Sequence, residues 1–444
     1  MKKLLVLTCV FLCLTSLVAA EMEEAPPAGS TGEKLAKMFV SLLAQGDFEK
    51  ATATFDDNMK GAVSPVSLET IWKSLRDTLG DYQKIEATKA ETSQQFRIVF
   101  VTCQFQKQRV DVKVVIDKAD KIAGLFFVPV QVAQYSPPSY VKATLFQDSD
   151  VTVGTGEWIL PGTVSMPVGK GPFPAVILVH GSGPNDKDES IGVNKPFRDL
   201  AWGLASRGVA VLRYEKRTRK YAAKIVDMKE LTVRDETIID ALEAVSLLKK
   251  TERIDPGKIF VLGHSLGGML APRIAVGNTN IAGLVILAGA ARPLEDLILE
   301  QTLFQVSLSG ELTLDNKKKV DEIRCEVEAV KKLSKESSPT CLLLGTPGSY
   351  WLDLKGYNPA GVAKTLKQPM LILQGERDCQ VRMDDFNEWR KVLSSRTDVM
   401  LKSYPTLNHL FMEVQGQSTG AEYQQASNVA ELVISDIAEW IKKY

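Results

Sequence analysis

The stretch Lys258-Ile-Phe-Val-Leu-Gly-His-Ser-Leu-Gly-Gly268 decides the fold of the larger part of this chain. Its first five residues form a short apolar run, which predicts a buried parallel strand. The apolar segment Met269–Val276 that follows predicts a helix. A serine in a Gly-x-Ser-x-Gly turn between such a strand and helix presents its hydroxyl above the sheet edge. The pattern therefore predicts Ser265 as a nucleophile, and the alternative is a glycine-rich turn with a capping serine.

The chain contains three histidines in 444 residues, so few side chains compete for the role of general base. A histidine, with an unperturbed pKa of about 6.5, takes and returns a proton near neutrality. His180 and His264 lie inside glycine-rich turns, which we expect them to brace. His409 lies between the strand-like segment Val399–Tyr404 and a helix predicted over residues 426–443. This position favours His409 as the base, and the alternative is a loop histidine without a role.

The acid is expected between the nucleophile and the base along the chain. The segment Gln368–Leu373 predicts a strand, and residues 374–381 form the loop that leaves it. We select Asp378 from this loop, with Glu376 as the alternative because it lies closer to the strand. The chosen carboxylate is expected to accept the imidazole N–H, fix the tautomer and stabilise the imidazolium.

A second apolar run, Ala175–Val179, precedes the loop His180-Gly-Ser-Gly-Pro-Asn-Asp186. Glycines in a loop after a buried strand let the main chain approach a substrate carbonyl without a Cβ in the way. We therefore expect the amides of Ser182 and Gly183 to form an oxyanion hole together with the amide of Leu266 in the serine turn.

These motifs together resemble the α/β-hydrolase family over residues 141–444. Four of them look like a narrower group, the secreted bacterial esterases of the EstD type, which carry an extra N-terminal domain. The four are His180–Asp186, Arg213–Arg217, Gly263–Gly268 and Gln374–Asp378. The resemblance implies a carboxylic-ester hydrolase without a cofactor or metal, in which Ser265, Asp378 and His409 are nucleophile, acid and base. It leaves open serine peptidases, thioesterases and acyltransferases, which belong to the same superfamily.

An alternation of strands and helices predicts a mostly parallel sheet with helices on both faces. The predicted elements are strands at Ala175–Val179, Val209–Tyr214 and Ile259–Leu262 and helices at Phe197–Ser206 and Val233–Lys249.

Residues 291–366 interrupt this alternation with an apolar segment, Leu297–Val306, and a charged helical segment, Leu314–Lys335. We expect a helical cap here that covers the nucleophile and shapes the acyl pocket. The alternative is a solvated surface excursion. The predicted pocket residues are Leu303, Phe304, Tyr350 and Trp351, which would equally suit the small core of the cap itself.

Residues 1–20 predict a secretory signal. Lys2 and Lys3 form its charged start, residues 4–17 its mostly apolar core, and Val18-Ala-Ala20 the small residues before a cut ahead of Glu21. The alternative is an uncleaved anchor, for which the apolar run is short. The protein is therefore expected to be secreted or periplasmic, without stable membrane insertion once the signal is removed.

Residues 32–134 predict a separate small α+β domain, because helical patterns precede strand-like runs. The helical patterns are Lys34–Leu43 and Val66–Leu75, and the strand-like runs are Phe96–Phe105, Arg109–Ile116 and Ile122–Pro129. This order resembles the nuclear-transport-factor-two-like fold. We see no catalytic constellation here and expect a packing or substrate-presenting role.

The charge balance argues against nucleic acid as a partner. Lys and Arg total 54, as do Asp and Glu, and removal of the two signal lysines leaves a net charge of −2. Secretion permits a disulfide between Cys325 and Cys341, and free thiols are the alternative, as for Cys103 and Cys379. No Cys/His spacing indicates a metal site. The sequence leaves a homo-oligomer open.

The sequence therefore predicts an exported serine carboxylic-ester hydrolase that acts on a small-molecule ester through an acyl-enzyme on Ser265. A serine peptidase would need an anchor for a peptide terminus. The charged residues Arg213, Glu215, Lys216 and Arg217 suit such an anchor, but we expect them to form a solvated charged loop instead. A noncatalytic ligand-binding protein on the same scaffold is the third hypothesis.

Overall fold

The computed structural model describes residues 31–93, 96–130, 135–226, 228, 230–308, 313–334, 336 and 342–444. The predicted signal, residues 1–20, and Cys341 lie outside these described residues. The chain divides into two compact units, Met1–Val132 and Ala133–Tyr444.

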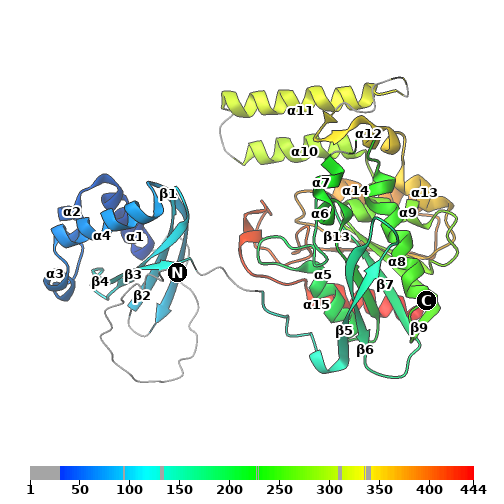
Figure 1. Cartoon of the computed structure of the whole chain (residues 1–444), viewed down its shortest axis with the longest axis horizontal. Helices are drawn as coiled ribbons and strands as arrows, with labels where there is room; N and C mark the ends of the chain where they lie inside the picture. Colours follow the sequence, from blue (N-terminus) through cyan, green and yellow to red (C-terminus); the bar gives the residue numbers. More distant parts are fainter. Residues whose placement is uncertain are drawn as a thin grey trace. The chain divides into compact units, whose positions relative to one another are not determined.

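Among its described residues, the N-terminal unit has helices followed by an antiparallel sheet (Figure 1). The helices are α1 (Thr31–Gln45), α2 (Phe48–Ala53), α3 (Asp57–Ala62) and α4 (Pro65–Leu79). The strands, in the order β1-β2-β3-β4, are β1 (Tyr82–Ser93), β2 (Phe96–Phe105), β3 (Arg109–Ile116) and β4 (Ile122–Pro129). The last three strands coincide with the predicted runs, whereas α2, α3 and β1 are additional.

Local signals explain how this unit forms. Ser64 accepts a hydrogen bond from the Ser67 amide, and Pro65 takes the first helical position of α4. Alternate residues of β2 are buried, as a sheet with one face on a core requires. Trp72 of α4 packs on Phe105 of β2, with ring centroids 5.5 Å apart. The unit therefore has a hydrophobic core of its own.

The C-terminal unit is built on an eight-stranded sheet in the order β14-β13-β10-β9-β7-β8-β6-β5 (Figure 1). The strands are β5 (Phe146–Val153), β6 (Leu160–Pro167), β7 (Phe173–Val179), β8 (Ala210–Tyr214), β9 (Ile254–His264), β10 (Gly283–Leu287), β13 (Met370–Gly375) and β14 (Val399–Tyr404). The strands from β14 to β8 are parallel, whereas β6 and β5 are antiparallel. The prediction of a mostly parallel sheet is confirmed. The predicted elements omit β5, β6 and β10. The edge strand β5 was missed because its exposed polar residues form no apolar run.

Helices cover both faces of the sheet, which explains why its central strands are apolar along their whole length. Every residue of β8, β10 and β13 is buried. One face packs against α8 (Ile239–Lys249), α9 (Leu266–Ala275) and α14 (Met383–Leu393). The other face packs against α5 (Pro196–Ala205) and α15 (Glu431–Lys443).

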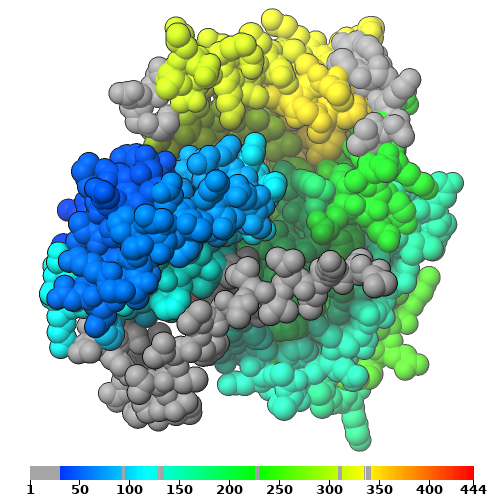
Figure 2. All heavy atoms as spheres, turned by 60° about the vertical axis from the view of Figure 1, so that its left-hand side comes forward, coloured from blue at the N-terminus to red at the C-terminus, as the bar shows by residue number. Residues whose placement is uncertain are grey.

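Between β10 and β13 the chain leaves the sheet. Its elements there are α10 (Leu294–Ser307), α11 (Leu314–Lys332), β11 (Leu342–Leu343), β12 (Thr346–Pro347), α12 (Gly348–Leu354) and α13 (Pro359–Thr365). Helices α10 and α11 lie side by side, and Lys331 Nζ is 2.7 Å from Asp296 Oδ1 between them (Figure 1). Figure 2 shows this segment, coloured yellow, as a layer across the top of the view.

Some helix ends differ from the predictions. The last helix, predicted from residue 426, begins at Glu431, because the preceding Asn428 and Val429 instead donate hydrogen bonds to the buried Asp199. The helix predicted from Val233 starts with one π-helical turn. The shorter elements are η1 (Ala143–Leu145), α6 (Arg217–Lys220), α7 (Ala222–Val226), η2 (Arg234–Ile238) and η3 (Ala421–Gln424).

The described part of the chain has neither a candidate membrane span nor a candidate metal site. No helix there combines the length and the apolar character that a membrane span needs. No group of three or more His, Cys, Asp or Glu side chains in that part is arranged to hold a metal ion. Among the described cysteines, Cys103, Cys325 and Cys379 form no disulfide with one another. The predicted pairing of Cys325 with Cys341 stays a prediction, because Cys341 lies outside the described residues.

Candidate active site

The turn between β9 and α9 holds Ser265 in a strained conformation. Its φ is +53° and its ψ is −116°, a region that a residue with a Cβ rarely adopts. Such a backbone costs about 1–3 kcal/mol and persists where the surrounding structure enforces it. The Ser265 amide donates to the Leu287 carbonyl oxygen at 2.9 Å, which ties the turn to β10. The turn leaves the side chain half-buried at the carboxyl edge of the sheet.

Close backbone contacts explain the glycines on either side of this serine. A Cβ on Gly263 would lie 2.1 Å from the carbonyl oxygen of Gly267. A Cβ on Gly267 would lie 2.2 Å from the carbonyl oxygen of Val179 at the end of β7. Only glycine therefore lets α9 start this close to the sheet.

The structure brings His409 and Asp378 together. Nδ1 of His409 lies 2.7 Å from Oδ2 of Asp378, and both side chains are buried. The Asp378 carboxylate also accepts hydrogen bonds from the amides of Gln380 at 2.7 Å and Val381 at 3.0 Å and from the Gln374 side chain at 3.0 Å. These donors fix the carboxylate so that one oxygen faces the imidazole.

Glu376, the alternative acid, points elsewhere. Its side chain is exposed and accepts a hydrogen bond from the Ser403 hydroxyl at 2.7 Å. The geometry therefore favours Asp378 as the partner of His409.

Ser265 and His409 line one cavity of about 630 Å³. Ser182, Gly183 and Leu266, the expected oxyanion donors, line the same cavity. Among the described residues, none accepts a hydrogen bond from the backbone amide of Ser182, Gly183 or Leu266. The amides are thus free to bind a ligand oxygen.

Two side chains donate hydrogen bonds to the loop that carries Ser182 and Gly183. Lys216 Nζ donates to the Gly181 carbonyl oxygen at 2.7 Å. The Asn185 side-chain amide donates to the Gly181 and Ser182 carbonyl oxygens at 3.2 and 3.1 Å. The loop carbonyls are therefore turned toward these donors.

The segment between β10 and β13 forms part of the cavity wall. Its lining residues are Ala290, Leu294, Leu297, Ile298, Gln301, Leu344, Gly345, Thr346, Tyr350 and Trp351. The predicted residues Tyr350 and Trp351 thus line the cavity, and they also belong to the hydrophobic core of the unit. The predicted Leu303 and Phe304 do not line the cavity. The lining face of α10 ends at Gln301, so Phe304 lies one turn beyond it, and Leu303 is 44% exposed.

A second histidine–carboxylate pair lies beside the first. His264 Nδ1 is 2.9 Å from Glu189 Oε2, and both side chains are buried. Burial lowers the pKa of His264, but the charge and contact of Glu189 outweigh it, so the pKa is raised above its ordinary value. Against the effect of burial, the charge of His264 lowers the pKa of Glu189. The pair therefore favours its ionised form.

His180 braces its own loop. Its Nε2 lies 3.0 Å from the Asp186 carbonyl oxygen, and its ring packs between Phe197 and Tyr214. Burial lowers the pKa of His180 to about 4. A neutral imidazole that donates to a loop carbonyl fits the predicted structural role.

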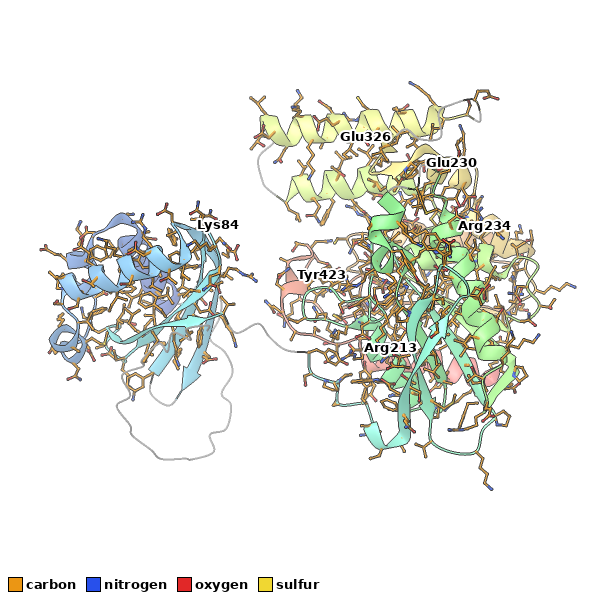
Figure 3. All side chains as sticks on the ribbon, viewed as in Figure 1. Lys84, Arg213, Glu230, Arg234, Glu326 and Tyr423 are labelled. Atoms are coloured by element: carbon orange, nitrogen blue, oxygen red, sulfur yellow. The ribbon has the colours of Figure 1, made fainter. Side chains whose placement is uncertain are left out.

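The prediction of a solvated charged loop at 213–217 is wrong, because its three cations are buried in ion pairs. Arg213, labelled in Figure 3, contacts Asp148 and Asp188 at 2.9 and 3.2 Å. Lys216 lies 3.1 Å from Glu236, and Arg217 lies 2.5 Å from Asp240. Buried cations require such partners, which are distant in sequence and therefore invisible to a local pattern.

Sequence reasoning missed Glu189 as well. It ends the run Asp186-Lys-Asp-Glu189, whose composition is typical of a solvated surface. A usable signal was its closeness in the chain to the glycine loop, since the Gly181 amide donates to Glu189 Oε1 at 2.6 Å.

Both units of the chain match known protein families. A model of the family described as serine aminopeptidase, S33, matches residues 172–414, which is more than half of the chain. The chain belongs to this S33 family of α/β-hydrolases. Esterase EstD of Thermotoga maritima is 41% identical to it over 406 residues, which cover 91% of this chain and 94% of EstD. The predicted resemblance to the EstD group is therefore confirmed.

The N-terminal unit matches a separate family. Residues 36–125 fit a family described as a protein of unknown function, DUF3887. The resemblance of this unit to the nuclear-transport-factor-two-like fold stays a prediction.

Solved structures of lower identity are also similar. An esterase of Pyrococcus furiosus is 18% identical, with a TM-score of 0.42, over 70% of this S33 hydrolase and 98% of that chain. A puromycin-hydrolyzing peptidase of Mycobacterium tuberculosis is 14% identical, with a TM-score of 0.45, over 81% of this chain and 48% of that one.

Proposed function

We propose that this protein is a serine carboxylesterase that forms an acyl-enzyme on Ser265. The observation that carries the proposal is that His409, held at Nδ1 by Asp378, lines the same cavity as the strained Ser265 turn. Its relation to EstD, which is named an esterase, supports the substrate class. The proposed substrate is a small ester.

The proposed reaction has two halves. Nε2 of His409 takes the proton of the Ser265 hydroxyl while Oγ attacks the ester carbonyl carbon. The carbon–oxygen bond to the alcohol breaks, and His409 returns the proton to the leaving alcohol. A water then gives a proton to His409 and attacks the acyl carbon. The bond between this carbon and Oγ breaks, and His409 returns the proton to Oγ, which releases the acid and restores Ser265.

The oxyanion of each tetrahedral intermediate is proposed to sit on the amides of Leu266, Ser182 and Gly183. Among the described residues none accepts a hydrogen bond from these amides, which supports this role. The Leu266 amide is at the N-terminus of α9, where the helix dipole also favours negative charge. Each such donor contributes about 3–4 kcal/mol to lowering the barrier in enzymes of this kind.

We also propose that residues 291–366 act as a cap that selects the acyl chain. The support is the apolar lining that α10 and α12 add to the cavity, which suits a neutral, apolar substrate. A bulkier side chain at Ile298 would then shorten the accepted chain.

The family description makes a serine aminopeptidase the second candidate. An aminopeptidase would need an unpaired carboxylate to bind the substrate ammonium group. Among the described residues that line the cavity, Glu189 and Glu236 are the only carboxylates, and each is paired, Glu189 with His264 and Glu236 with Lys216. Glu236 also accepts a hydrogen bond from the Tyr350 hydroxyl at 2.9 Å. This pairing favours an uncharged ester over a peptide amine.

The proposal is tested with p-nitrophenyl esters from acetate to palmitate beside aminoacyl p-nitroanilides. We expect kcat/KM for the best ester to exceed that for any anilide by at least about 100-fold. The Ile298→Trp variant should move the optimum to shorter esters. Turnover of the anilides at a comparable rate would favour the peptidase. No turnover of either substrate class would favour a thioesterase, an acyltransferase or a binding protein.

We further propose that the protein is exported and cleaved before Glu21. The charged, apolar and small-residue parts of residues 1–20 support this proposal. Mass spectrometry of protein recovered from the periplasm or medium should give Glu21 as the N-terminal residue. Recovery of chains that begin at Met1 in the membrane fraction would instead indicate an uncleaved anchor.

A further inference from the structure

Glu189 contacts two parts of the site that lie far apart in the chain. Its Oε1 accepts the amide hydrogen of Gly181 at 2.6 Å, at the base of the loop that carries Ser182 and Gly183. Its Oε2 lies 2.9 Å from Nδ1 of His264, the residue before the nucleophile. One carboxylate therefore touches both the oxyanion loop and the serine turn.

His264 extends this connection to the base. Its Nε2 lies 2.9 Å from the main-chain carbonyl oxygen of His409. A carbonyl oxygen only accepts, so Nε2 of His264 must carry a hydrogen. Nδ1 then faces the carboxylate of Glu189, where a bare lone pair would be repelled. The pair therefore needs one proton to avoid this repulsion, and the raised pKa of His264 agrees with this. The contact is an ion pair at 2.9 Å and does not have the geometry of a hydrogen bond.

The packing around this connection is tight. The rings of His264 and His409 have centroids 4.7 Å apart. A Cβ on Gly181 would lie 3.1 Å from the Ser265 Cβ. Glu189 itself has a φ of +50°, which the surrounding contacts must enforce. A shift of Glu189 would thus be passed on to the oxyanion loop and to the loop of the base.

We propose that Glu189 is a positioning residue that holds the oxyanion loop and, through His264, the main chain of His409 in one fixed arrangement. This inference rests on the proposed role of Ser265, since it concerns the same reaction. Glu189 takes no proton from the substrate and forms no bond to it. It contributes because its side chain is long enough to contact the Gly181 amide and the His264 imidazole at the same time.

Three substitutions of Glu189 separate the effect of its side-chain length from the effect of its charge. Glu189→Gln keeps the reach, because its oxygen accepts from Gly181 and its NH2 group donates to Nδ1 of a neutral His264. Glu189→Asp keeps the charge but is one methylene shorter, so it cannot make both contacts. Glu189→Ala removes both. Asp240→Asn is the matched control, because it alters another buried ion pair, with Arg217, that does not line the cavity.

We expect Glu189→Ala to lower kcat for the best ester by about 100-fold with KM within about threefold, as a small misplacement of reacting groups does. Glu189→Gln should stay within about tenfold of the wild type, and Glu189→Asp should be slower than Glu189→Gln. Asp240→Asn should lower the thermal midpoint and leave kcat within about twofold.

Full-length variants are also compared by the rate at which a fluorophosphonate labels Ser265, which needs no ester preference. The same order of rates should appear. A folded Glu189→Ala with kcat near that of the wild type would overturn the proposal. If Glu189→Ala does not fold, Glu189→Asp equal to or faster than Glu189→Gln would overturn it. A wild type that labels at Ser265 but hydrolyses no ester would refute the ester function and leave this comparison intact.

Discussion

Replacement of Ser265 by alanine is expected to lower kcat for p-nitrophenyl esters by about 10⁵–10⁶-fold. In the proposed reaction the oxygen of this hydroxyl forms the acyl bond, and alanine has no atom that can do so. What remains is the binding and oxyanion contribution, which in serine hydrolases is about 10³–10⁴-fold over water. The measurement is ester turnover at saturating substrate with purified protein.

The fold of this variant should be unchanged, because alanine keeps the Cβ and can adopt the same φ of +53°. Its thermal midpoint therefore serves as the internal check. Ser246→Ala is the matched control, since that exposed hydroxyl only donates to the Leu242 carbonyl oxygen. Ser265→Ala that retains turnover within about tenfold would show that the reaction does not pass through this serine.

Asp378→Asn is expected to lower kcat/KM by about 10⁴-fold. Oδ1 of Asp378 accepts from the amides of Gln380 and Val381, so the single oxygen of asparagine should stay there. Its NH2 group would then face Nδ1 of His409 and donate to it. The imidazole would be held with its hydrogen on Nε2, a tautomer that cannot take the proton of Ser265.

Glu376→Gln is the matched control for this variant. Its side chain is exposed and bonded to Ser403, so kcat/KM should stay within about twofold of the wild type. The two variants are compared across pH with one ester. A harmless Asp378→Asn beside a severe Glu376→Gln would show that the acid is Glu376.

Much of the fold could be predicted from local patterns. The strands β2, β3 and β4 have the predicted bounds because alternating or apolar runs end at turn residues. The edge strand β5 could not be predicted, since its polar residues face solvent and resemble a loop. The short helices α2 and α3 were missed because six residues carry little periodicity.

The sequence also predicted the chemistry of the candidate site better than its surroundings. Gly-x-Ser-x-Gly, the loop after β13 and the rarity of histidine pointed to Ser265, Asp378 and His409. The choice between Asp378 and Glu376 needed the tertiary structure, in which Asp378 Oδ2 lies 2.7 Å from His409 Nδ1. The pocket residues Leu303 and Phe304 were misplaced, because the pattern of a helix does not say where a cavity ends along it.

Local sequence by itself determined the sheet type, the serine turn and the order of the predicted catalytic residues. These features depend on neighbours within a few positions: a glycine where a Cβ cannot fit, and an apolar run where both faces are covered. Only the tertiary structure decided that Arg213, Lys216 and Arg217 are buried and that Glu189 meets His264. The physical reason is that a buried charge needs a partner, and folding draws that partner from a distant part of the chain.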